Sequence, residues 1–144
     1  MPDPVNDPMI SINTPTGVQN IVNPLYNYTF HPQPSASDFP PSERLSVYHS
    51  TVRYPTDSGQ SQPNLANQRL QANAKALHDL TYQLIADTPS YAPFADAAYS
   101  DGRGGSYNSI ENMHNAIHSM VGGNGHMAII PFAAFDPVFW LHHA

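Results

Sequence analysis

The chain contains no cysteine and few charged residues of either sign. Without cysteine it can form no disulfide and offers no thiolate to a metal, so a metal site would have to use imidazole, carboxylate or water. The absence is also compatible with a reducing compartment. Five Lys and Arg stand against eleven Asp and Glu, which gives a formal net charge of -6. This balance argues against nucleic acid or an anionic membrane surface as a partner.

Long apolar runs are missing as well. No run approaches the roughly 18 residues of a membrane-spanning helix, so we expect no transmembrane segment. The opening residues MPDPVNDP have neither a basic segment nor an apolar core, so we expect no signal peptide in this sequence. A cytoplasmic location is the expectation that follows.

The residues that are present suit a globular piece with long loops. A length of 144 residues fits one domain or part of a larger one. The 40% of hydrophobic residues can form a core, whereas 15 prolines and only 11% of charged residues indicate long ordered loops. We therefore expect a mainly α fold with long loops and a small β-hairpin.

The hairpin is predicted near the N-terminus, within residues 9–30. Apolar residues alternate on both sides of the turn-rich residues 13–17, which is typical of a β-hairpin with a longer loop. The aromatic residues of 24–30 would give this small hairpin a surface to lean on. Residues 31–63 are rich in Pro, Ser, Asp and Gln and predict loop, with short strands or turns at most near 45–52.

Residues 64–87 are the clearest helix, with Asn64 as a possible cap. Apolar or small residues recur along it at spacings of three and four and should bury one face: Leu70, Ala74, Leu77, Thr81 and Leu84. His78 lies beside this stripe. We interpret it as exposed or hydrogen-bonded, because nothing nearby completes a ligand set. A further short turn of helix is expected around 94–98.

Five of the eight histidines lie between Glu111 and Ala144. They are His114, His118, His126, His142 and His143. His114 and His118 are four residues apart, and on an α-helix this spacing places both imidazoles on one face. Because a site of borderline softness needs three or four such donors, a further histidine should supply the third ligand.

A second helix is predicted to bring that ligand. Asp136 can accept from free amide groups as an N-cap, and Pro137 suits the first helical position. Residues 138–141 should bury this helix. His142 and His143 follow, and adjacent helical residues point about 100° apart, so both cannot bind one ion in the same way. One is a ligand candidate and the other a supporting residue.

The combined pattern resembles the second copper-binding motif of tyrosinases, the type-3 dicopper monophenol oxidases, in a form most like the fungal enzymes. The matching residues are His114-x-x-x-His118, a glycine-rich loop, and the segment Phe-Asp-Pro-Val-Phe-Trp-Leu-His-His at 135–143. The resemblance implies that residues 1–144 are part of a type-3 copper α-helical bundle domain. The second-copper motif would occupy residues 109–144.

The resemblance also assigns roles. It implies that His114, His118 and His143 bind copper and that His142 supports the site without ligating it. Glu111 and Asn115 match the pair that holds a water near the coppers and assists substrate deprotonation.

Glu111 also has a local interpretation. The site helix should start near Asn108 or Ser109, and Asn108 with Glu111 has the spacing of a capping box. One residue can serve both purposes. His126, in the glycine-rich loop, is interpreted as a loop or supporting residue.

The earlier motif of a complete tyrosinase, with three further histidines for the first copper, has no match here. His31, His49 and His78 are too scattered. We therefore expect an internal fragment that is inactive alone. The complete protein would oxidise monophenols to o-diphenols and o-quinones with dioxygen, as in melanin-type pigment chemistry.

Three alternatives remain open at this point. One is a catechol oxidase without the hydroxylase step, and another is a hemocyanin-like oxygen carrier. The third is a zinc or structural histidine site, against which the aromatic context of the His-His pair argues.

Overall fold

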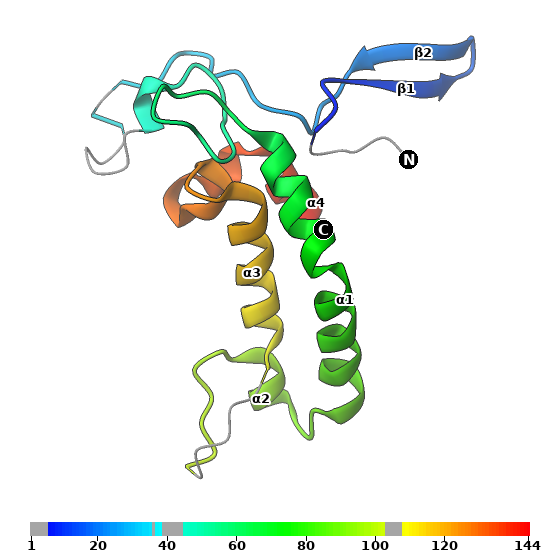
Figure 1. Ribbon diagram of the computed structural model, residues 1–144, viewed down its shortest axis with the longest axis vertical. Coiled ribbons are helices and arrows are strands. Elements are labelled where there is room, and N and C mark those ends of the chain that lie inside the picture. The colour runs from blue at the N-terminus through cyan, green and yellow to red at the C-terminus, as the bar shows by residue number, and fades with distance from the viewer. Residues whose placement is uncertain (1–5, 36, 39–44, 103–107) are drawn as a thin grey trace.

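The computed structural model describes residues 6–35, 37–38, 45–102 and 108–144. The elements follow the chain in this order: β1 Met9–Thr14, β2 Gly17–Val22, the 3-10 turn η1 Leu45–Val47, α1 Pro63–Asp87, α2 Tyr91–Ala95, α3 Ile110–Gly122, the 3-10 turns η2 His126–Ala128 and η3 Ile130–Phe135, and α4 Pro137–His142. The fold is mainly helical with one hairpin and long connecting loops (Figure 1), which confirms the expected class.

The two longest helices, α1 and α3, lie side by side and run in opposite directions, with α2 in the connection at one end (Figure 1). The predicted helix 64–87 is confirmed to within one residue. Asn64, however, lies inside the first turn and does not cap it. The N-cap is Gln62, without a side-chain cap bond, because Pro63 occupies the first helical position that its fixed φ favours.

The apolar stripe of α1 is only partly buried. Leu84 is buried, Leu70 and Leu77 are half-buried, and Ala74 and Thr81 are exposed. The helix therefore packs against α3 along a narrow line. His78 lies on the exposed part of α1, with its ring 3.4 Å from the carboxylate of its neighbour Asp79, as the sequence predicts.

Strands β1 and β2 form a two-stranded antiparallel sheet in which Met9 faces Val22 and Thr14 faces Gly17. The longer loop predicted over 13–17 is wrong, because pairing continues up to a two-residue turn at 15–16. The hairpin projects away from the helices (Figure 1). From the sequence we expected the hairpin to pack on the aromatic segment that follows it, but it extends away instead (Figure 1). Phe30 from that segment is buried against the ring of His126, 5.6 Å away between centroids, and against Phe135.

The main hydrophobic core lies directly beside the histidine-bearing elements. Its buried members come one each from α1, α3, η2 and α4: Ala66, Val121, Met127 and Val138. Tyr54 and Leu25 pack against them from the N-terminal loops. The core thus joins the helices to segments far away in the sequence.

Two local expectations are wrong. Helix α4 buries only Val138, while Trp140 and Leu141 are 65% and 58% exposed, because a six-residue helix can turn only one narrow face to the core. The short helix expected at 94–98 lies at Tyr91–Ala95, where Pro93 fits the first turn.

Residues 1–5, which open the segment in which we expect no signal peptide, lie outside the described residues. Among the described residues, no helix is both long and apolar enough to cross a membrane.

Candidate metal centre

Helix α3 carries the first two histidines. Ser109, fully buried, caps it: its Oγ accepts a hydrogen bond of 3.1 Å from the Asn112 amide. The capping box expected from Asn108 is therefore wrong, because a serine one residue later already satisfies the free amide. From this start the helical period places His114 and His118 on one face, with their ring centroids 4.6 Å apart.

Helix α4 begins as the sequence predicts. The Asp136 side chain accepts a 3.0 Å hydrogen bond from the Val138 amide, and Pro137 occupies the first turn. The helix runs back toward α3, so that His142 is its last residue and His143 its C-cap. Two histidines distant in sequence from the first pair thereby join it.

Two ring nitrogens from other histidines lie close to Nε2 of His114. Nε2 of His114 lies 2.7 Å from Nε2 of His143 and 3.2 Å from Nε2 of His118. No two of these residues are sequence neighbours. Imidazole nitrogens at such distances repel when both carry lone pairs, so a proton or a cation is needed among them.

Hydrogen bonds determine which nitrogen of each ring carries the proton. Nδ1 of His118 lies 2.7 Å from the Met127 carbonyl oxygen, and Nδ1 of His143 lies 2.6 Å from the Phe139 carbonyl oxygen. A carbonyl oxygen only accepts, so both Nδ1 atoms donate. In the neutral rings, Nε2 is then left with its lone pair directed at the cluster.

His114 follows the same rule. Its Nδ1 lies 3.1 Å from Oδ1 of Asn115, an acceptor, so its Nε2 also carries a lone pair. Three imidazoles whose Nδ1 atoms face oxygen acceptors form the donor set that a copper or zinc ion prefers. The residues present therefore fit a metal ion.

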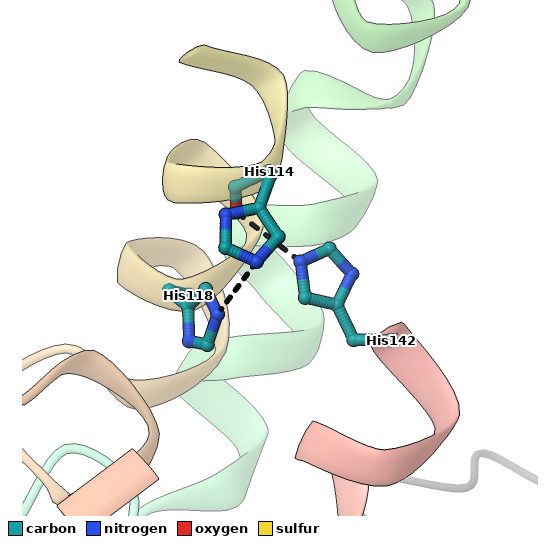
Figure 2. Close-up of side chains that lie close together, drawn as sticks. All are labelled: His114, His118 and His142. Atoms are coloured by element: carbon teal, nitrogen blue, oxygen red, sulfur yellow. Dashed lines mark hydrogen bonds between the residues drawn. The ribbon is translucent and has the colours of Figure 1, made fainter. Parts of the chain in front are cut away.

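His142 gives a second possible third ligand. One nitrogen each from His114, His118 and His142 lies within 4.8 Å of the others, and Figure 2 shows the His142 ring reaching from α4 toward α3. Its Nε2, however, lies 3.2 Å from the main-chain oxygen of His114 and must donate to it. This bond ties α4 onto α3, and in the neutral ring it leaves the lone pair on Nδ1.

Burial lowers the pKa of His118, and the neighbouring His114 and His143 rings lower it further, against the opposing hydrogen bond to Met127. The pKa of His142 is also lowered, first by burial and then by the adjacent His114. Both rings are therefore neutral near pH 7, which is the form that binds a metal.

A cavity of about 450 Å³ adjoins the three convergent nitrogens. Its lining combines the histidines with apolar side chains: His114, Asn115, His118, Ser119, Met127, Ala128, Ile130, Ala133, Phe139 and His143. The Phe139 ring stacks on the His143 ring with 3.8 Å between centroids. A small planar molecule can reach the cluster from this side.

The two predicted catalytic residues are placed differently. Asn115 lines the cavity and accepts from His114. Glu111 is exposed, and its carboxylate accepts a 2.8 Å hydrogen bond from the Ala97 amide, which joins α3 to the α2 region. The role of this pair at a water molecule stays a prediction.

Some contributors to the site were not identified from the sequence. The carbonyl groups of Met127 and Phe139, which orient two rings, carry no residue-type signal at all. Arg53 forms a buried ion pair of 2.7 Å with Asp136. The one feature of the sequence that distinguishes Arg53 is that it is one of only five Lys and Arg residues.

Imidazoles from α3 and the end of α4 that converge beside a cavity define a histidine-ligated metalloprotein. Comparison with known proteins identifies which one: the common central domain of tyrosinase matches residues 2–144. The chain therefore belongs to the tyrosinase family, a family of copper oxidoreductases, and copper is its cofactor.

Individual relatives agree with this assignment. A tyrosinase of Neurospora crassa is 40% identical over 136 residues, covering 87% of this chain and 18% of the relative. The structure of recombinant mushroom tyrosinase superposes with a TM-score of 0.82 at 29% identity, covering 99% of this chain and 26% of that one. Hemocyanin 1 of Megathura crenulata is 57% identical over 37 residues, covering 24% of this chain and 1% of its own. The chain thus spans about a fifth to a quarter of its tyrosinase relatives.

Proposed function

We propose that His114, His118 and His143 bind one copper ion and form the second-copper half of a type-3 site. The observation that carries this proposal is the convergence of their three Nε2 atoms while each Nδ1 faces an oxygen acceptor. His142, whose Nε2 donates to the His114 carbonyl oxygen and so ties α4 to α3, is assigned a supporting role.

In the complete protein, we propose, the site oxidises monophenols to o-diphenols and o-quinones with dioxygen. Copper bound by three imidazoles supplies one-electron chemistry and open coordination positions for dioxygen. The chain's own contribution is to hold three neutral donors in place and to provide the apolar cavity wall of Met127, Ala128, Ile130 and Ala133 for the aromatic ring of a phenol.

Glu111 and Asn115 are proposed to hold a water that accepts the phenol proton. Asn115 is already at the cavity. Glu111 would have to leave the Ala97 amide, an exposed bond that costs little to exchange for water. A Glu111→Gln variant of the complete enzyme should then lose turnover while retaining copper.

By itself the chain is proposed to be catalytically silent. Within residues 6–35, 37–38, 45–102 and 108–144, the single group of three or more potential metal ligands is His114, His118 and His142. The proposed ligand His143 directly follows the last of these. His31, His49 and His78 lie outside this group. Because a two-electron exchange with dioxygen needs a second copper, phenol turnover should appear only in the complete protein.

The first test is copper content of the purified chain. We expect about one tightly held copper per chain, set by one complete three-imidazole donor set. In His118→Ala and His143→Ala we expect only weaker binding by the remaining imidazoles. His78→Ala is the matched control, since that ring lies exposed on α1. No specific copper, or equal uptake by all variants, would refute the proposed site.

Two other functions remain to be separated in the complete protein. A catechol oxidase would oxidise o-diphenols but not monophenols. An oxygen carrier, favoured by the 57% identity to hemocyanin 1 over 37 residues, would bind dioxygen reversibly without turnover of either. Assaying both phenol classes side by side distinguishes the three.

A further inference from the structure

We propose that Val52 and Arg53, two consecutive buried residues far from the histidine-bearing stretch, are positioning residues for His118 and His143. This Val52–Arg53 brace rests on the copper site proposed above and adds to it. One residue acts through the turn η2 on the His118 ring. The other acts through the N-cap of α4 on the His143 ring.

The Val52 arm consists of two main-chain bonds to one histidine. The Val52 amide donates to Nδ1 of His126 over 3.1 Å, and the His126 amide donates to the Val52 carbonyl oxygen over 3.1 Å. His126 is completely buried. These two hydrogen bonds fix η2. The next residue, Met127, presents the carbonyl oxygen that accepts from Nδ1 of His118. The proton position on His118 is therefore set from Val52.

The glycine-rich turn makes this approach possible. A Cβ on Gly125 would lie 2.1 Å from the Val52 carbonyl oxygen, a distance that no side chain tolerates. Gly123, at φ +62°, would collide in the same way with the Tyr54 ring, and the Tyr54 amide donates to the Gly122 carbonyl oxygen over 2.9 Å. The end of α3 and the following turn thus rest directly on residues 52–54.

The Arg53 arm is a buried bidentate ion pair. Nε and Nη2 of Arg53 donate to the two carboxylate oxygens of Asp136 over 2.8 and 2.7 Å, and Nη2 also donates to the Leu25 carbonyl oxygen. Arg53 is 2% exposed and Asp136 is 0% exposed. The same Asp136 caps α4 by accepting from the Val138 amide.

Helix α4 depends on this anchor for its place. It has six residues, far fewer than an isolated helix needs to be stable in water. His143 follows at its C-cap, about two turns beyond the anchor. A buried ion pair adds little net stability compared with apolar packing, but it fixes orientation through two parallel bonds. Its effect here is to set where Nε2 of His143 lies.

The decisive experiment is a double-mutant cycle on Cu(II) affinity, measured by competition titration on the chain. Arg53→Met should weaken binding ten- to a hundredfold, the range typical of residues that orient a ligand. In the His143→Ala background, the same substitution should have no further effect, because it acts through that ligand. A general structural role would lower affinity equally in both backgrounds, and that result overturns the inference for Arg53.

The Val52 arm is tested through its partner His126. His126→Leu should weaken copper binding in the wild-type background and leave it unchanged in His118→Ala. In the copper-free chain, the imidazole ¹⁵N spectrum should show His118 losing its Nδ1–H form. His126→Asn, whose side-chain oxygen can accept from Val52, should restore both readouts. Unchanged His118 protonation in His126→Leu overturns this arm.

Folding is controlled separately. Arg53→Met/Asp136→Asn avoids an unpaired buried charge while keeping an oxygen that caps α4, and it should give the same loss of affinity as Arg53→Met. Leu45→Ala, a buried residue outside the brace, should lower stability without weakening copper binding below the unfolding temperature. If it weakens binding as much as Arg53→Met, the brace has no specific role.

The two hypotheses fail in different ways. If the wild-type chain takes up no copper, or His143→Ala binds it as well as wild type, the proposed site is wrong. If those controls behave as expected but Arg53→Met and the Arg53→Met/Asp136→Asn variant bind like wild type, the site stands and the brace is refuted. The electron paramagnetic resonance spectrum adds a check, since Arg53→Met should resemble His143→Ala in its nitrogen ligation.

Discussion

Nε2 of His114 lies 2.7 Å from Nε2 of His143, although 29 residues separate them in the chain. The Nδ1 atom of each ring is already engaged, in His114 with the side-chain oxygen of Asn115 and in His143 with the carbonyl oxygen of Phe139. Neither Nδ1 can therefore replace Nε2 as the metal-binding atom. Two lone pairs this close are stable only with a positive charge beside them. The pair is therefore the geometric centre of the proposed copper site.

The choice between His143 and His142 as third ligand can be measured directly. His143→Ala should reduce Cu(II) affinity more strongly than His142→Ala, since the first removes a donor and the second only the bond to the His114 carbonyl. We expect a ten- to hundredfold loss for His142→Ala, the range of an orienting residue. Competition titration of both variants decides, and the reverse order would assign the ligand to His142.

Stability of the copper-free chain should fall on mild acidification because of His126. Burial lowers the pKa of this ring to about 4 from its ordinary value of 6.5. The Val52 amide, which donates to Nδ1, also requires that nitrogen to be unprotonated. Between those values the unfolded chain binds a proton that the folded chain does not. Stability is therefore complete above pH 6.5 and declines as the pH falls toward 4, by up to about 3 kcal/mol in total.

Urea unfolding at intervals from pH 7.5 to about pH 4 checks this expectation. In His126→Asn, which cannot titrate, the decline should be correspondingly shallower. Parallel curves for the variant and the wild type would show that another group carries the pH dependence.

The buried ion pair should be sensitive to the loss of one partner. Arg53→Met leaves Asp136 charged, buried and without its main donor, and should lower the free energy of unfolding by about 3–5 kcal/mol. Arg53→Met/Asp136→Asn should be less destabilised than Arg53→Met, because no net charge stays buried. Denaturant unfolding of the two variants compares them, and equal losses would contradict a charge-based cost.

The start of α3 provides a test of its cap. Ser109→Ala removes the oxygen that accepts from Asn112 and should cost about 1 kcal/mol. Asn108→Ala should cost less, since Asn108 does not cap the helix. Both are measured by thermal unfolding, and a larger loss at Asn108 would restore the capping box that the sequence alone suggested.

Prediction from sequence succeeded where the signal is local and periodic. The helix at 64–87 follows from its apolar spacing, the hairpin from its alternating residues, and the start of α4 from the cap chemistry of Asp136 and Pro137. The structure confirms these three elements. It failed where two local solutions compete. Asn108 and Ser109 both suit an N-cap, and only the burial of Ser109 selects between them.

Burial of α4 was likewise mispredicted. The apolar residues 138–141 predict a buried segment, yet Trp140 and Leu141 are exposed. Apolar character shows what can be buried, but the number of faces that meet a core depends on which neighbours pack there. No pattern within six residues contains that information.

The sequence by itself determined the donor chemistry: without cysteine, and with histidines at spacing four on one helix and adjacent at the end of another, an imidazole site was the available choice. The tertiary structure decided the rest. It set which nitrogen of each ring faces the site, through carbonyl groups that any residue could supply, and it brought Val52 and Arg53 against the turn and helix that hold His118 and His143. The Val52 contact spans 74 positions of the sequence and the Arg53 contact spans 83. Only the folded chain brings such distant groups within hydrogen-bonding distance.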